Sequence, residues 1–315
     1  MERQNHIITI YKGIQKYQKS KVTMHKSGFV NIIGHPNVGK STLMNVLMGE
    51  KLSIITPKAQ TTRHRILGII NGDDFQIVYS DTPGIVKPHY KLHESMMKFV
   101  HTALQDADVF IYLTEVGENN FDEEVIEKIK LSGKPLIFVI NKIDMVSAEE
   151  AALKVNYWEE KLDNALVIPI SAKMNANINR IVEEVVKLLP ENPPYFAKDD
   201  ELSDRPLRFF ISEIIREKIF MLYKQEIPYS TEVVIESYKE KKDITHIAAT
   251  IFVERETQKA ILLGHKGAAI KKLGMTARKD IEAFIEQHVF LELSVKVSDD
   301  WRENPNQLKR FGYEF

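Results

Sequence analysis

The sequence reads FVNIIGHPNVGKS from Phe29 to Ser41, an apolar run followed directly by a loop that contains two glycines. The loop fits the pattern of Gly, four variable residues, Gly, Lys and Ser, and a helical pattern opens after it. A strand, a glycine loop and a helix in this order make a concave site where backbone N–H groups and a helix N-terminus face a polyphosphate. We therefore predict a phosphate-binding loop formed by Gly34, His35, Pro36, Asn37, Val38, Gly39, Lys40 and Ser41, with Thr42 directly after it.

Strand-like and helical patterns alternate around this loop, from residue 27 to residue 190. The alternation predicts an α/β domain with a mostly parallel six-stranded sheet and helices on both faces. Ligands of such sheets bind at the carboxyl ends of the strands. The strand patterns are Phe29–Ile33, Ile66–Ile70, Phe75–Tyr79, Val109–Leu113, Leu136–Ile140 and Leu166–Ile170, and the helical patterns are Ser41–Met48, Leu92–Leu104, Phe121–Ile129, Ala148–Leu162 and Ile178–Leu189.

A segment with several prolines separates this domain from a second pattern. Residues 191–206 cannot continue the preceding helix and are predicted to be a linker. From residue 207 to residue 315 the order is helix, two paired strands, short helix, helix and strand, which predicts an α+β module. Its helical patterns cover Leu207–Tyr223, Ala268–Leu273 and Thr276–Gln287, and its strand patterns cover Thr231–Tyr238, Ile244–Val253 and Val289–Val297.

The composition sets limits on the class of protein. The chain has 315 residues, 43% hydrophobic content and a net charge of −1, so it can form one large core or two modest ones. The net charge does not indicate nucleic-acid or membrane binding, which would have to come from local patches. The chain has no cysteine, which excludes disulfides and cysteine-bound zinc and fits the reducing cytoplasm. No apolar stretch approaches the roughly 18 residues that a membrane span needs.

Residues 1–26 form a Lys- and Gln-rich extension before the first strand pattern. They lack the apolar core and the small-residue cleavage site of a secretory signal. We expect this extension to be disordered, and a sharper hypothesis places the start of translation at Met24.

Three further motifs predict which nucleotide binds. Asp81 can hold Mg²⁺ through a water, and the Gly84 N–H can contact a γ-phosphate because no side chain blocks its approach. The Asp144 carboxylate can accept hydrogen bonds from N1–H and the 2-amino group of guanine, whereas adenine has neither donor and would leave the carboxylate unpaired. Asn141 can tie this loop to the phosphate loop. The predicted residues are Asp81, Thr82, Pro83 and Gly84 after the third strand, Asn141, Lys142 and Asp144 after the fifth, and Ser171, Ala172 and Lys173 after the sixth.

At these motifs the chain resembles the translation-factor-like GTPases, in their Era-like branch. The resemblance implies GTP and GDP as ligands and Mg²⁺ as the metal ion. It also implies that Thr62, directly before Arg63, is a switch residue that completes the coordination of Mg²⁺ only when GTP is bound, with Thr61 as the alternative. The implied metal-binding residues are Ser41, Thr62 and Asp81, and the implied catalytic residues are Lys40, Thr62, Gly84 and Asn37.

Hydrolysis of GTP is predicted to be slow. Ras-like GTPases carry a water-orienting glutamine directly after the DxxG motif, where this chain has Ile85, which cannot orient water by hydrogen bonding. Relatives with asparagine at the position of Asn37 can use a K⁺ ion beside the phosphates. We hypothesise the same K⁺ site here, and the alternative is an asparagine that caps a loop turn.

The second module contains a second glycine loop, Gly264-His265-Lys266-Gly267. This loop fits the GXXG pattern of KH domains, in which a backbone loop clamps about four nucleotides of single-stranded nucleic acid. An apolar run precedes the loop and a basic helix start follows it, and the order of elements matches the type II KH topology. The predicted RNA-binding residues are Gly264, His265, Lys266, Gly267, Lys271, Lys272, Arg278 and Lys279.

A GTPase domain followed by a type II KH domain is the arrangement of the Era family of ribosome-assembly GTPases, and the resemblance extends from Met24 to Phe315. It includes Phe290-Leu291-Glu292-Leu293 in the last strand pattern. The family implies binding to the 3′ end of small-subunit (16S) rRNA and a role in assembly of the 30S subunit, with access to RNA controlled by GTP. It also implies a monomer in the cytoplasm, part of which associates peripherally with the inner face of the cell membrane.

Two other readings remain open at this point. One is a GTPase of the same branch that acts on a different RNA, such as tRNA. The other is a membrane-associated interaction protein of the cell cycle. A P-loop kinase is disfavoured because Asn141-Lys142-Ile143-Asp144 would then have no role.

Overall fold

The computed structural model describes residues 24–56, 58, 60–162, 165–197 and 202–313. Of the extension predicted over residues 1–26, residues 1–23 lie outside the described part of the chain, whereas Lys26 already belongs to the first strand, so the extension ends earlier than predicted. Two compact units form. Counting described residues, the first contains the chain from Met24 to Ser53 with Thr62–Val86 and Phe99–Asp204, and the second contains Ile54–Thr61, Lys87–Lys98 and the chain from Arg205 onward.

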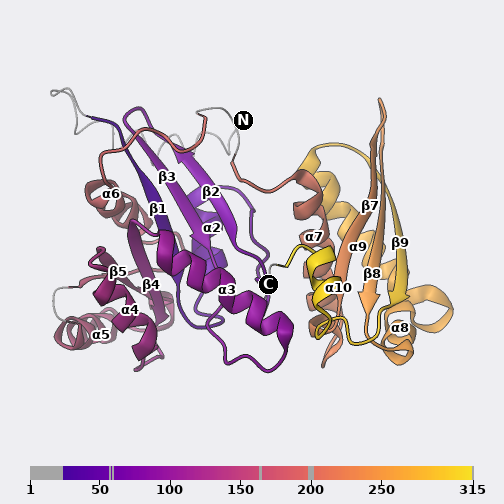
Figure 1. The fold of residues 1–315 in the computed structure, drawn as a ribbon, viewed down its shortest axis with the longest axis horizontal. Coiled ribbons are helices and arrows are strands. Elements are labelled where there is room, and N and C mark those ends of the chain that lie inside the picture. The colour runs from indigo at the N-terminus through magenta and orange to yellow at the C-terminus, as the bar shows by residue number, and fades with distance from the viewer. Residues whose placement is uncertain (1–23, 57, 59, 163–164, 198–201, 314–315) are drawn as a thin grey trace. The chain divides into compact units, whose positions relative to one another are not determined.

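The first unit is built on a six-stranded sheet with the order β2-β3-β1-β4-β5-β6 (Figure 1). The β2–β3 pair is antiparallel and the four other neighbouring pairs of these strands are parallel, so the sheet is mostly parallel, as the sequence predicts. The strands are β1 (Lys26–Ile33), β2 (Ile66–Asn71), β3 (Phe75–Asp81), β4 (Val109–Glu115), β5 (Leu136–Asn141) and β6 (Leu166–Pro169).

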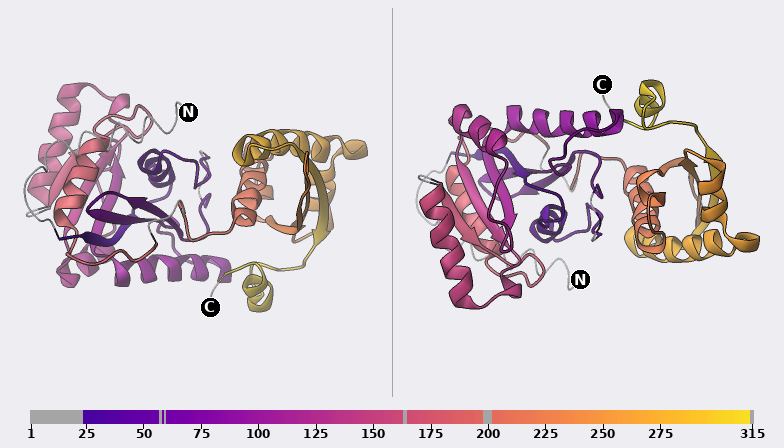
Figure 2. Two further views of the ribbon diagram at one scale, coloured as in Figure 1. Left: turned by 90° about the horizontal axis from the view of Figure 1, so that it is seen from above. Right: turned by 90° about the horizontal axis from the view of Figure 1, so that it is seen from below.

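Helices cover both faces of this sheet (Figure 2). On one face, Trp158 and Ile126 pack with Phe110 and Phe138 in a buried cluster. On the other face, a side chain at Gly68 of β2 would collide with Met44, so this strand allows a helix to approach closely. The helices are α2 (Lys40–Met48), α3 (Lys91–Asp106), α4 (Glu123–Ser132), α5 (Ala148–Lys161) and α6 (Ile178–Leu188).

The second unit has a three-stranded sheet with the order β7-β8-β9, in which β7 and β8 are antiparallel and β8 and β9 are parallel. Side chains of α7 and α9 form an apolar core with one face of this sheet. The elements are α7 (Leu207–Leu222), β7 (Glu232–Glu240), β8 (Thr245–Val253), α8 (Glu256–Leu263), α9 (Ala268–Ile285), β9 (Val289–Val297) and α10 (Pro305–Arg310).

The structure differs from the sequence prediction at Gly274, where two helical stretches were expected. Helix α9 instead runs unbroken through this glycine. A side chain at Gly274 would make only an ordinary contact, 3.6 Å from Leu293 Cδ1. The apolar face of α9, with Leu273, Ala277 and Ile281 fully buried, therefore outweighs the roughly 1 kcal/mol that glycine costs inside a helix.

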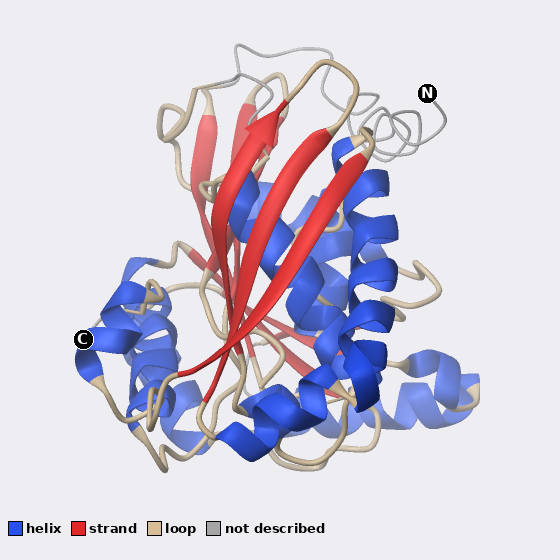
Figure 3. Cartoon of the chain, turned by 90° about the vertical axis from the view of Figure 1, so that its right-hand side faces the viewer, coloured by secondary structure: helices blue, strands red, loops and turns tan. Residues whose placement is uncertain are grey.

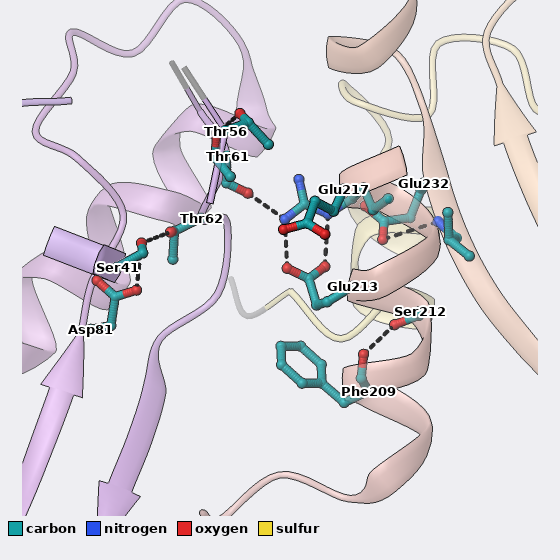
Figure 4. Close-up of polar contacts among 12 residues, drawn as sticks. Ser41, Thr56, Thr61, Thr62, Asp81, Phe209, Ser212, Glu213, Glu217 and Glu232 are labelled. Carbon is teal, nitrogen blue, oxygen red and sulfur yellow. Dashed lines mark hydrogen bonds and ion pairs between the residues drawn. The ribbon is translucent and has the colours of Figure 1, made fainter. Parts of the chain in front are cut away.

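Helix α7 carries a buried ion pair. Arg216, which is 1% exposed, donates from Nε to Glu213 Oε1 at 2.7 Å and from Nη2 to Glu213 Oε2 at 2.6 Å. Arg216 also donates to the carbonyl of Thr61, within the segment Ile54–Thr61 of the same unit (Figure 4). This arginine thus satisfies polar groups of two segments that are distant in the sequence.

Candidate nucleotide and RNA sites

The phosphate loop connects β1 to α2 and depends on its glycines. Gly34 has φ +154° and Gly39 has φ +102°, conformations that residues with a side chain rarely adopt. Space also excludes a side chain, because a Cβ atom would lie 2.2 Å from the Leu113 carbonyl at Gly34 and 2.3 Å from Asn141 Nδ2 at Gly39. The loop backbone is therefore held tightly against the ends of β4 and β5.

Lys40 lies at the start of α2 with its ammonium inside the loop. Its Nζ donates to the carbonyls of Gly34 at 2.9 Å and His35 at 2.8 Å. Burial lowers the pKa of Lys40 to about 8, and the nearby charge of Asp81 partly opposes this shift. The loop thus positions a cation where the resemblance places the β- and γ-phosphates.

Ser41, Thr62 and Asp81 converge from three different segments (Figure 4). The Ser41 hydroxyl lies 2.8 Å from Thr62 Oγ1 and donates to Asp81 Oδ2 at 2.8 Å. Burial raises the pKa of Asp81, and within the described chain its other oxygen, Oδ1, is buried without a hydrogen bond of normal geometry. Two hydroxyls and an unsatisfied carboxylate oxygen are the hard oxygen ligands that suit Mg²⁺, so these three residues fit the predicted metal.

The rest of the DTPG motif anchors the loop after β3. The Thr82 hydroxyl donates to the Ile32 carbonyl at 2.9 Å, and a Cβ atom at Gly84 would lie 2.9 Å from Pro36. The Ile85 N–H donates to the Gly34 carbonyl at 3.4 Å, and its side chain packs against an apolar cluster. Glycine thus allows this motif to lie directly against the phosphate loop.

Asn141 connects three of the predicted motifs. It is 3% exposed, its Nδ2 donates to the Val38 carbonyl at 2.8 Å, and its Oδ1 accepts from the Ala172 N–H at 3.0 Å. The tie to the phosphate loop that the sequence predicts is therefore present, and the same side chain also holds the loop after β6.

The other residues of the NKID motif lie at the same edge of the sheet. Lys142 has φ +64°, and its Nζ donates to the Asn37 carbonyl at 2.9 Å and to Glu115. The Asp144 carboxylate is exposed, and its Oδ1 accepts from the Ser171 hydroxyl at 2.5 Å. This bond fixes the orientation of a carboxylate that can face the edge of a base.

Sequence reasoning missed Glu115 and Glu118, which contact predicted site residues. His35 Nδ1 lies 3.3 Å from Glu118 Oε1, and this hydrogen bond raises the pKa of His35. Their position in the sequence could have indicated them. Glu115 is the last residue of β4 and Glu118 follows it, and the carboxyl end of β4 lies at the same edge of the sheet as the motifs.

The GHKG loop of the second unit joins α8 to α9. Gly264 has φ +69°, Lys266 has φ +48° and Gly267 has φ +77°. A Cβ atom at Gly264 would lie 2.6 Å from the Ala269 side chain. The predicted basic side chains are all exposed, on the loop at His265 and Lys266 and on α9 at Lys271, Lys272, Arg278 and Lys279. The loop therefore presents cations and a helix start to solvent, which suits a phosphate backbone.

Among the described residues, no group of three or more His, Cys, Asp or Glu side chains could hold a metal ion. No helix in the described part of the chain combines the length and apolar character that crossing a membrane requires.

Comparisons with known proteins agree with these two sites. The model of the 50S ribosome-binding GTPase family matches residues 29–142, and the KH domain model matches residues 226–302. A relative from Geotalea daltonii, "GTPase Era", is 45% identical over 291 residues, which cover 91% of this chain and 98% of the relative.

Two solved structures are each 40% identical to this chain, and each match spans 92% of this chain and the whole of the matched chain. One, with a TM-score of 0.88, is Era in complex with MgGDPNP and nucleotides 1506–1542 of 16S ribosomal RNA. The other, with a TM-score of 0.87, is a variant of Aquifex aeolicus Era bound to GDP·AlF4⁻.

Proposed function

Since this chain belongs to the Era family of GTPases, we propose that its guanine-nucleotide state controls binding to the 3′ end of small-subunit rRNA during 30S assembly. The family confirms the predicted fold, a P-loop GTPase domain followed by a KH domain, and the predicted hydrolysis of GTP. The RNA, the subunit and the control by nucleotide are the parts that we propose.

The proposal that this chain binds RNA rests mainly on one observation. A relative that matches 92% of this chain holds MgGDPNP and a segment of 16S rRNA in the same crystal, and this chain has a Gly264–Gly267 loop on which the His265 and Lys266 side chains are exposed. A nucleotide site and an RNA clamp in one chain are the two parts that a nucleotide-controlled RNA-binding protein needs.

In the nucleotide site, this chain's own residues have distinct tasks. Lys40 and the loop N–H groups neutralise the phosphates, and Asp144 selects guanine through its N1–H and 2-amino group. Ser41, Thr62 and Asp81 would hold Mg²⁺, which neutralises the charge that develops on the β- and γ-phosphate oxygens. Ile85 packs against apolar side chains and offers no hydrogen bond to water, so we expect slow turnover.

The proposed K⁺ site at Asn37 has a direct test. Asn37 is exposed within the phosphate loop with φ +66°, and its backbone carbonyl, not its side chain, accepts from Lys142 at 2.9 Å. GTP turnover should be faster in KCl than in NaCl, and an Asn37→Ala variant should lose this difference. Equal rates of the unaltered protein in the two salts would contradict the K⁺ site.

The proposed RNA site is tested by binding to a synthetic RNA with the sequence of the 16S 3′ end. A double variant, His265→Asp with Lys266→Asp, reverses the charge of the loop and should weaken binding strongly. Lys130→Asp on α4 is the matched control, because Lys130 is exposed in the first unit. Equal affinity of the double variant and the unaltered protein would refute the assignment.

The same binding assay distinguishes between the two candidate RNA partners. A tRNA that binds as tightly as the 16S segment would favour the second RNA reading. Peripheral membrane association is a separate proposal, and sedimentation with lipid vesicles in the presence and absence of residues 1–23 tests it. Size-exclusion chromatography with light scattering tests the proposed monomer.

A further inference from the structure

The sheet of the second unit has one face that the helices leave open. Along β9, Leu291 and Leu293 pack into the apolar core, whereas Phe290 and Glu292 alternate to the opposite face. Figure 3 shows the three long strands in front, and side chains of α7 and α9 pack against their other face. The loop Gly264–Gly267 leads into α9, so the open face is a different surface from the predicted RNA clamp.

The two ends of this open face differ in how far their aromatic side chains are exposed to solvent. At one end, the Phe311 ring lies 5.1 Å from Phe252 and the Arg310 guanidinium lies 5.7 Å above the Phe252 ring, so Phe252 is only 6% exposed. At the other end, Phe290 is 53% exposed, although its ring lies 5.2 Å from His246. The chain thus covers one aromatic side chain of the face with its own C-terminal residues and leaves the other accessible.

A pocket of about 240 Å³ lies at the accessible end, lined by Lys239, Lys241, His246, Phe290 and Glu292. The strand register explains this grouping, because Lys239 pairs with His246 on β7 and β8, and His246 pairs with Phe290 on β8 and β9. One row across the sheet therefore carries a cation, an imidazole and a phenyl ring.

The charged side chains of this pocket have no ion-pair partners among the described residues. Lys239 is exposed, and neither Lys239 nor Lys241 forms an ion pair with any described residue. Glu292 is also exposed and accepts no hydrogen bond within the described chain. The pocket thus offers two cations, one free carboxylate and an aromatic face to a ligand.

We propose that this pocket is a second binding site for single-stranded RNA, separate from the GHKG loop. A base stacks on Phe290 beside His246, Lys239 and Lys241 contact the flanking phosphates, and Glu292 accepts a hydrogen bond from an amino group of the base. An aromatic platform beside cations is the combination that binds single strands without a duplex. The volume of about 240 Å³ is smaller than the roughly 300–1,000 Å³ of drug-sized sites and is large enough for one base.

This inference rests on the proposed RNA binding but adds a site to it. A GXXG loop clamps about four nucleotides, and here the loop lies on the helix side of the sheet. A four-nucleotide RNA therefore reaches the loop alone, whereas a longer strand can continue to the open face. Length dependence of binding distinguishes the two sites.

The first experiment measures affinity of the full chain for a four-nucleotide RNA and for a twenty-nucleotide single strand that begins with it. Phe290→Ala should weaken binding of the long RNA roughly 5- to 150-fold, the usual effect of losing one stacked base, and leave the short RNA unchanged. Lys239→Glu with Lys241→Glu should also reduce the salt slope for the long RNA by about 1.4, because each contacted phosphate contributes about 0.7. Leu131→Ala is the control, since Leu131 is an 80% exposed apolar residue in the first unit.

The outcomes separate the two proposals. If the unaltered protein binds neither RNA, the proposed RNA function and the second site both fail. If the protein binds both RNAs and the open-face variants bind the long RNA as tightly as the control does, the second site is wrong while the RNA function stands.

A second measurement detects stacking directly. Trp158 and Trp301 are both 0% exposed, so a Phe290→Trp substitution introduces the single solvent-facing indole of the described chain. Long RNA should quench its fluorescence, and the quenching should persist when the loop carries Lys266→Asp at RNA concentrations that restore binding. Saturating RNA without any change in the fluorescence of this added indole would overturn the proposal.

Discussion

Replacement of Asn141 by alanine should weaken nucleotide binding, because the Asn141 side chain joins two loops of the nucleotide site. The change removes two buried hydrogen bonds, to the Val38 carbonyl at 2.8 Å and from the Ala172 N–H at 3.0 Å. Each buried group left without a partner costs about 1–3 kcal/mol, so the pair amounts to about 2–6 kcal/mol. If the nucleotide must restore the order of both loops when it binds, the lower limit corresponds to a loss of roughly 30-fold in affinity.

Titration with a fluorescent GDP analogue measures this loss, and urea unfolding of the same variant measures the loss in stability. Asn141→Asp separates the two bonds. Its carboxylate has the size of the amide and keeps the acceptor for the Ala172 N–H, but it places an oxygen against the Val38 carbonyl, so it should bind weakly although one of the two bonds remains. An Asn141→Ala protein with unaltered affinity and unaltered stability would refute the role of this side chain as a tie between the loops.

Two further predictions concern charged pairs. Glu213→Ala leaves Arg216, which is 1% exposed, without its carboxylate partner. Loss of one partner of a buried pair should cost about 3–5 kcal/mol in unfolding free energy, whereas Glu124→Ala, which breaks a solvent-exposed pair, should lower the unfolding free energy far less. Similar losses in the two variants would contradict this. The second pair is His35 and Glu118: because the folded-state pKa of His35 is raised above 6.5, its contribution to stability is complete below pH 6.5 and is lost as the pH rises through that raised pKa. Glu118→Gln should remove this decline, so identical pH profiles of unfolding free energy would disprove the coupling.

The nucleotide motifs could be predicted from the sequence because their chemistry is local. A strand pattern that ends in Gly34, Asp81 or Asn141 fixes each residue at the carboxyl edge of the sheet, and that edge brings them together in the structure. The same reasoning placed the GHKG loop before a basic helix, which the structure has as α9.

The remaining features depend on contacts between residues far apart in the chain. Glu118 reaches His35 across 83 residues, and Arg216 reaches Thr61 across 155, and no local pattern records either pairing. The continuity of α9 through Gly274 follows from core packing rather than from propensity. The pocket beside Phe290 depends on the register of β7, β8 and β9, which the alternation of apolar residues alone does not specify.

The most direct test of the central claim is the affinity of the full chain for the 16S 3′-end RNA, measured with a non-hydrolysable GTP analogue, with GDP and with the matching ATP analogue. We expect tight binding only with the GTP analogue, because Asp144 selects guanine and Thr62 responds to the γ-phosphate. Equal RNA affinity in all three nucleotides, or equal effects of the GTP and ATP analogues, would contradict it.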